Sequence, residues 1–139
     1  MRNREIIPNY GPDSKNIVTG IEKALQAAVG KNMEITIIIP NISSIDGVLE
    51  ILYGSAFLKA IKKGTPIQFE GKKITINIVS DRTMTSFNVK QIALCIYVTS
   101  KMLEKINDFP KIVSEIVIPW IEDDVRIYRK TWELGGSIE

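Results

Sequence analysis

Short runs of apolar, largely β-branched residues alternate along this chain with longer segments in which apolar residues recur at helical spacing. The clearest runs are 34–40, 92–98 and 114–119, and each has the length of a strand. Near-continuous apolar strands are typical of sheets that are buried on both faces. Because the intervening segments are long enough to cross back over a sheet, the alternation predicts a mainly parallel sheet with helices on both sides.

Four helices are expected, each beginning near a residue that can cap its first turn or complement its dipole. They cover 14–29, capped by Asp13 or Ser14; 44–63, capped by Ser44 or Asp46; 99–107, capped by Thr99 or Ser100; and 120–132, with three carboxylates in its first turn. Gly30 and Gly64 stand where the first two helices should end. The segment 83–91 is ambiguous, with a short helix as one interpretation.

The segment 67–79 alternates around Glu70, Gly71 and Lys72, which predicts a hairpin whose longer second arm continues as a sheet strand. The elements together predict a small Rossmann-like three-layer α/β sandwich with four to five strands and one hairpin insertion. The chain has no internal repeat and no linker composition. We therefore expect residues 1–139 to form a single α/β domain, frayed at 1–12 and 134–139.

Composition excludes several chemistries. The 139 residues include no histidine, which removes the Ser-His-Asp and Cys-His nucleophile systems and His-ligated zinc. The single cysteine, Cys95, lies within an apolar run, so we expect a buried and unreactive thiol. No apolar run approaches the roughly 20 residues of a membrane helix, and the charged N-terminus is broken by Pro8. These features predict a soluble, cytoplasmic protein with no membrane partner.

Charge is nearly balanced but unevenly distributed. With 18 basic and 16 acidic residues the formal net charge is +2, too small to predict a nucleic-acid partner. From Lys59 to Lys111 there are ten basic and four acidic residues, whereas from Ile112 to Glu139 there are six acidic and three basic ones. The lysines near the second helix end and the hairpin turn are interpreted as a solvated surface. They are Lys59, Lys62, Lys63, Lys72 and Lys73.

Ligands of open parallel sheets bind beyond the carboxyl ends of the strands, where loops and helix N-termini converge. Each predicted strand end here turns abruptly from apolar to polar. The candidate ligand-binding residues at these ends are Asn41, Ser43, Ser44, Asp81, Arg82, Thr99, Ser100 and Trp120. For each hydroxyl taken alone, a helix cap is the favoured interpretation. Asp81 and Arg82 form the pair best suited to a ribose hydroxyl and a phosphate or carboxylate.

Familiar cofactor motifs are missing. The sequence contains neither Gly-x-Gly-x-x-Gly after a strand nor Gly-x4-Gly-Lys-Ser/Thr, so dinucleotide and P-loop chemistry lose their main support. Asp46, Asp81 and the acidic trio 122–124 have no metal-site spacing, and the trio suits the dipole of the helix that it begins. We predict no metal site, and the sequence identifies no cofactor.

Three functions remain open at this stage. One is a module that binds or senses a small anionic or nucleotide-like molecule at the strand ends. A second is a protein-interaction subunit, such as a homodimer or a part of a larger assembly, for which Tyr128 and Trp132 could supply an apolar interface. The third is a small enzyme of nucleotide or sugar-phosphate chemistry that uses Asp81 or another carboxylate as a general base, although no catalytic pair is recognisable.

Overall fold

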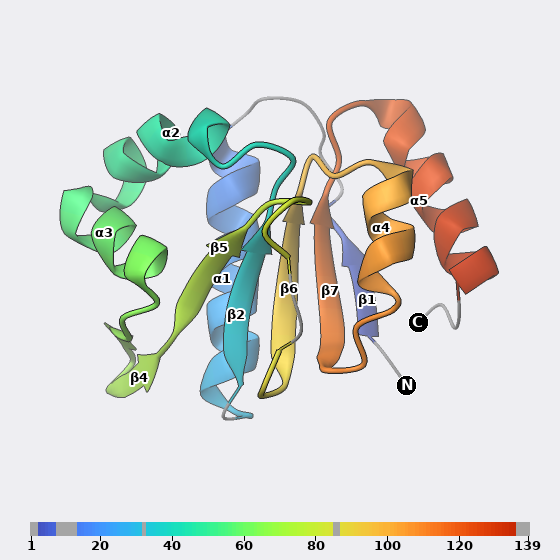
Figure 1. Cartoon of the computed structure of the whole chain (residues 1–139). Coiled ribbons are helices and arrows are strands. Elements are labelled where there is room, and N and C mark those ends of the chain that lie inside the picture. Colours follow the sequence, from blue (N-terminus) through green and yellow to red (C-terminus); the bar gives the residue numbers. More distant parts are fainter. Residues whose placement is uncertain (1–2, 8–13, 32, 85–86, 136–139) are drawn as a thin grey trace.

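The most apolar run of the sequence forms the central strand β6 (Gln91–Ile96), and all six of its residues are buried in this computed structural model (Figure 1). The structure describes residues 3–7, 14–31, 33–84 and 87–135. β6 belongs to a five-stranded parallel sheet with the order β1-β7-β6-β2-β5. The other strands are β1 (Asn3–Ile6), β2 (Glu34–Ile38), β5 (Ile76–Val79) and β7 (Ile112–Ile118). The predicted α/β fold with a Rossmann-like parallel sheet is confirmed.

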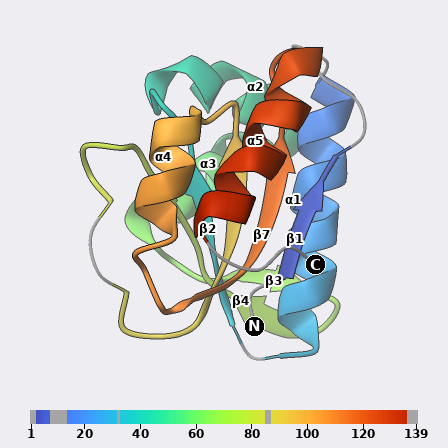
Figure 2. The same cartoon turned by 90° about the vertical axis from the view of Figure 1, so that its right-hand side faces the viewer.

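Helices cover both faces of the sheet (Figures 1 and 2). One face carries α1 (Ser14–Val29), α2 (Ser43–Tyr53) and α3 (Ser55–Lys63); the other carries α4 (Ser100–Ile106) and α5 (Glu122–Gly135). Successive residues of a strand face opposite sides, so Ile37 packs in the core beneath α1–α3 and Ile38 in the core beneath α4 and α5. The sheet therefore separates two apolar cores.

Gly20 sets how closely α1 approaches the sheet. A Cβ atom at this position would lie 2.8 Å from Cδ1 of Leu94 and 2.9 Å from Cδ1 of Ile118. The missing side chain lets the middle of α1 rest directly on β6 and β7. Within the described residues, no helix has both the length and the apolar character needed to cross a membrane.

The prediction of one continuous helix over 44–63 is wrong. The chain breaks at Gly54, where φ is 91° and ψ is 164°, and the two halves become α2 and α3. That conformation is strained for any residue with a side chain, so the glycine marks a bend and not merely a weak point in a helix. The break lets Leu49 on α2 and Leu58 on α3 both reach the core.

Two further expectations near the sheet need correction. Residues 3–6 were expected to be frayed, yet they form β1, which pairs in parallel with β7. The optional short helix at 83–91 is not formed by the described residues there; Thr83 lies in a turn, and residues 87–90 are irregular and lead into β6. The predicted hairpin is confirmed as β3 (Ile67–Phe69) and β4 (Lys72–Ile74), with positive φ at Glu70 and Gly71.

A buried ion pair fixes β1 at the edge of the sheet. Nε of Arg4 donates to Glu115 at 2.8 Å, and the two side chains are 3% and 0% exposed. The guanidinium also donates to Asn107 at 3.0 Å and lies 5.8 Å from the centre of the Trp132 ring. Arg4 therefore joins β1 to β7, α4 and α5. The buried pair holds this four-residue strand in the sheet, because separating Arg4 from Glu115 would leave two buried charges unpaired.

Replacing Arg4 by Met should lower the free energy of unfolding by about 3–5 kcal/mol, because it leaves the Glu115 carboxylate buried without its partner. Urea denaturation would measure the loss. The matched control is Lys23→Met, which removes the exposed pair between Lys23 and Glu5 (2.7 Å) and should cost less than about 1 kcal/mol. Equal effects of the two variants would contradict a structural role for the buried pair.

Tyr128 locks α5 to the end of β6. Its hydroxyl donates to the backbone oxygen of Val98, and its side chain is fully buried. Burial, with a smaller contribution from the Asp124 carboxylate, raises the pKa of Tyr128 far above its ordinary value of 10.0. The folded protein thus holds the phenol protonated at a pH where the unfolded chain releases the proton.

This shift predicts a loss of stability in alkali. A group whose folded pKa is raised stabilises the fold fully below its unfolded pKa, and the contribution disappears as the pH rises above about 10. Tyr128→Phe should therefore be less stable than wild type at pH 8 but should show a smaller further loss between pH 9.5 and 11. Thermal melts across that range measure the difference, and parallel losses in both proteins would count against the buried phenol.

Candidate functional site

A cavity of about 490 Å³ opens at the carboxyl edge of the sheet, which is the edge at which the parallel strands end (Figure 1, top). It lies between α1, α2 and the ends of β2, β6 and β7. Its described lining residues are mostly apolar: Ile17, Ile39, Pro40, Asn41, Ile45, Val48, Tyr97 and Trp120. Its size and position are those of ligand pockets in open parallel sheets.

Two aromatic rings form one wall of the cavity. Tyr97 follows the last residue of β6 and Trp120 follows β7, and their ring centres lie 4.8 Å apart at 75°. The backbone nitrogen of Tyr97 donates to Ile118 at 3.0 Å, so the chain stays attached to β7 beyond the end of the strand. Tyr97 has a φ of 56°, an uncommon conformation for a residue with a large side chain. Non-glycine residues held this way concentrate at functional sites.

Trp120 is held by the start of α5. Oδ2 of Asp124 accepts from the backbone nitrogen of Trp120 at 3.0 Å and from that of Ile121 at 3.1 Å. This capping arrangement fixes the turn between β7 and α5 while the indole is 46% exposed. The ring therefore stands at the mouth of the cavity. The acidic trio expected to complement a helix dipole also orients this ring through Asp124.

The other side of the cavity is the turn from β2 into α2. Pro40 and Asn41 line it, and Ile42 occupies the N-cap position without a side-chain hydrogen bond to the first turn. Backbone N–H groups at a helix start carry partial positive charge and can bind an anion. The predicted residues Ser43 and Ser44 are the first two residues of α2, but their side chains lie outside the described part of the structure.

The remaining predicted residues lie along the same edge but are not part of this lining. Asp81 accepts from Nζ of Lys105 at 3.1 Å, and Arg82 is exposed beside it. Thr99 caps α4 by accepting from the nitrogen of Met102 at 3.1 Å, and Ser100 is the first residue of that helix. The structure thus brings Asn41 and Trp120 together at one cavity. Asp81 pairs with Lys105 in the last turn of α4, whereas Thr99 and Ser100 form the start of that helix.

Sequence reasoning missed Tyr97. It treated 92–98 as one strand, so the tyrosine counted as part of a buried run. The signal that could have found it is its position: it is an aromatic residue at the point where the run reaches the polar residues Thr99 and Ser100. Cys95, two residues earlier, is fully buried, as expected.

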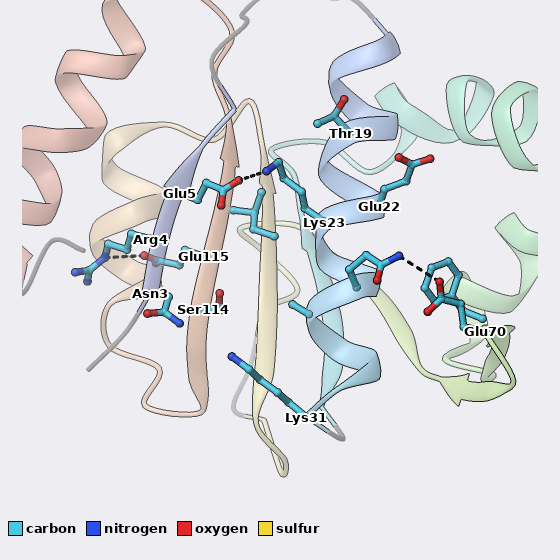
Figure 3. A pocket seen from close by; sticks show the side chains of 14 residues that line it. Asn3, Arg4, Glu5, Thr19, Glu22, Lys23, Lys31, Glu70, Ser114 and Glu115 are labelled. Carbon is cyan, nitrogen blue, oxygen red and sulfur yellow. Dashed lines mark hydrogen bonds and ion pairs between the residues drawn. The ribbon is translucent and has the colours of Figure 1, made fainter.

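A larger groove of about 900 Å³ lies away from the carboxyl edge, on the face of the sheet beside α1 (Figure 3). β1 and β7 form its floor, α1 one wall, and Phe69 and Glu70 of the hairpin its end. Lys23 reaches across to Glu5 at 2.7 Å, and Gln26 donates to Glu70 at 3.4 Å (Figure 3). The polar side chains of Lys23, Glu5, Gln26 and Glu70 therefore bind one another across the groove. The groove is open and follows from α1 covering β6 and β7 but leaving β1 uncovered.

The described residues contain no group of three or more Asp, Glu, Cys or His side chains placed to hold a metal ion. Comparison of the chain with protein family models, curated proteins and solved structures found no match. The fold and the cavity define a small Rossmann-like α/β protein with an apolar, aromatic pocket at the carboxyl edge of its sheet. Its function must be inferred from that pocket.

The two tryptophans test this geometry directly. Trp120 stands half-exposed at the cavity mouth, whereas Trp132 is 2% exposed. In Trp132→Phe, the remaining fluorescence should be quenched readily by acrylamide. In the reciprocal Trp120→Phe variant, the remaining fluorescence should be largely protected. Equal quenching in the two variants would show that the indoles are not placed as described.

Proposed function

We propose that this protein binds or senses a small molecule at the carboxyl-edge cavity and that the ligand places a planar, apolar group against Tyr97 and Trp120. The observation that carries the proposal is the aromatic wall within a preformed apolar cavity at the position where parallel sheets bind ligands. A nucleobase or another flat ring has the shape and polarity for such a wall, because aromatic faces attract one another through offset and edge contacts.

The polar end of the ligand would face α2. Asn41 lies at the rim, and the first turn of α2 begins directly after the Pro40–Asn41 turn. A phosphate or carboxylate is the group such a helix start favours. A nucleotide-like or aromatic anionic metabolite thus satisfies both ends of the cavity. The planar ring of such a ligand would contact Tyr97 and Trp120, and its anionic group would lie at the first turn of α2.

Binding without turnover fits the lining better than catalysis. Among the described lining residues, the phenol of Tyr97 is the one group that titrates. General acid-base chemistry needs a positioned pair of titrating groups within reach of the substrate. Asp81, the carboxylate suggested as a general base, forms an exposed pair with Lys105 instead of lining the cavity. We therefore favour a binding or sensing role over an enzymatic one.

A protein-interaction role is the competing proposal. It draws support from apolar side chains left in solvent: Ile51 on α2 is 87% exposed, and Ile121 beside the cavity mouth is 49% exposed. Trp120 could equally anchor a protein partner, since exposed aromatic residues often do so. Light scattering after size exclusion gives a first distinction. A monomer at micromolar concentration favours the small-ligand role, and a stable dimer that loses affinity in Trp120→Ala favours the interaction role.

The small-ligand role predicts a thermal response. A panel of nucleosides, nucleoside monophosphates and aromatic carboxylates should include compounds that raise the melting temperature, because a ligand that binds only the folded state stabilises it. For a compound that binds, Trp120→Ala should weaken affinity by about ten- to a hundredfold, the effect of losing one stacking partner worth about 1–3 kcal/mol.

The matched control is Val89→Ala, which truncates another exposed apolar side chain, 44% exposed, at the opposite edge of the sheet. It should leave ligand affinity unchanged. The proposal fails if no compound of the panel shifts the melting temperature, or if Trp120→Ala binds the active compound as tightly as wild type.

A further inference from the structure

The opposite edge of the sheet, where the strands begin, gathers lysines that are scattered in the sequence. Lys31 lies before β2, Lys90 before β6 and Lys111 before β7, and all three are exposed. The nitrogen of Glu34 donates to the oxygen of Lys90 at 3.2 Å, and the nitrogen of Gln91 donates to that of Lys111 at 2.8 Å. Lys90 and Lys111 therefore stand at neighbouring strand starts, and adjacent strands are about 4.8 Å apart.

Three more lysines extend this series from the hairpin and α3. Lys72 and Lys73 line a cavity of about 410 Å³ together with Lys31, and no acidic residue is found among the described residues of its lining. Lys63 ends α3 beside Gly64, where an added Cβ would lie 3.0 Å from Oδ1 of Asn77 on β5. We call these six residues the lysine row. They are Lys31, Lys63, Lys72, Lys73, Lys90 and Lys111; Figure 1 shows the strand starts and the hairpin at the lower side of the sheet.

The lysine row carries uncompensated charge. None of its six members forms an ion pair with a described residue, in contrast to Lys23, Lys62 and Lys105. Three carboxylates are found near this edge. Glu34 accepts from the amides of Gln91 and Asn77, Glu70 accepts from Gln26, and Asp108 is exposed. Among the described residues of this edge, six lysines against three carboxylates leave an excess of three positive charges.

We infer that the lysine row is a binding surface for the phosphate backbone of a nucleic acid, recognised without contacts to the bases. A series of like charges at neighbouring strand starts suits a polymer whose charges repeat at regular intervals. A protein partner would need a central apolar anchor, and Val89 is the one large apolar side chain among the described residues of this edge that is clearly exposed. No exposed aromatic ring among them is available for base stacking, so binding should not depend on base sequence.

This inference is independent of the small-ligand site and reverses the expectation drawn from net charge. Of the 16 acidic residues that bring the net charge near zero, Glu122, Asp123 and Asp124 lie in the first turn of α5 at the carboxyl edge. A polymer that lies along the strand starts meets the lysine row and not those carboxylates. Charge segregation between the two edges, and not overall composition, determines what the amino-terminal edge can bind.

The test is fluorescence anisotropy of a labelled, mixed-sequence single-stranded DNA of about 20 nucleotides, titrated with the full chain between 50 and 200 mM NaCl. Six phosphate contacts predict a slope of about −4 in log K against log salt, at roughly −0.7 per contact. Lys90→Gln/Lys111→Gln should reduce the magnitude of the slope by about 1.4 and weaken binding at 50 mM NaCl.

The control Lys101→Gln/Lys130→Gln makes the same change in net charge on α4 and α5, away from the lysine row, and should bind as wild type does. Absence of binding at 50 mM NaCl, or an equal loss in the control variant, would overturn the inference. Competition by poly-glutamate as effective as that by unlabelled DNA would also overturn it, because the partner would then be an acidic protein. Trp120→Ala should not change DNA affinity, which separates this test from that of the small-ligand site.

Discussion

Parallel pairing of β6 with both β2 and β7 is the constraint from which the other features follow. Because parallel neighbours run in one direction, each connection between them must cross over a face of the sheet. The crossovers provide the helices that bury the two cores. They also bring every strand end to one edge and every strand start to the other, so the fold itself creates two chemically distinct edges.

The sequence predicted the sheet well because its signals are local. Runs such as 92–98 are apolar throughout, and Thr99 caps α4 as its position suggests. The errors arose where tertiary contacts override local pattern. The sequence of β1 resembles a charged, frayed terminus. In the structure, Arg4 forms an ion pair with Glu115, more than a hundred residues away in the sequence. From the sequence, Gly54 is only a weak position within a helix. The structure shows that the chain bends there, which lets both Leu49 and Leu58 be buried in the core.

The sequence predicted at which edge of the sheet the candidate site lies, but not which residues contact one another there. Polar residues after each strand pointed to the carboxyl edge of the sheet, and Asn41 and Trp120 line a cavity at that edge. Which of the eight predicted residues meet depends on strand order, which a single sequence does not specify. β2, β6 and β7 are adjacent, so Tyr97 and Trp120 come together. β5 lies at the far side of β2, and Asp81, two residues beyond its end, pairs with Lys105 of α4 instead.

The central claim is that the carboxyl-edge cavity is the ligand site. Its most direct test is a ¹H–¹⁵N NMR spectrum of the protein recorded against a library of small aromatic and nucleotide-like fragments. The account predicts that fragments that bind shift the backbone signals of Asn41 and Tyr97 and the indole signal of Trp120, while the indole of Trp132 stays unchanged. Fragments that shift signals of the groove beside β1, or that leave all three of those signals in place, would contradict it.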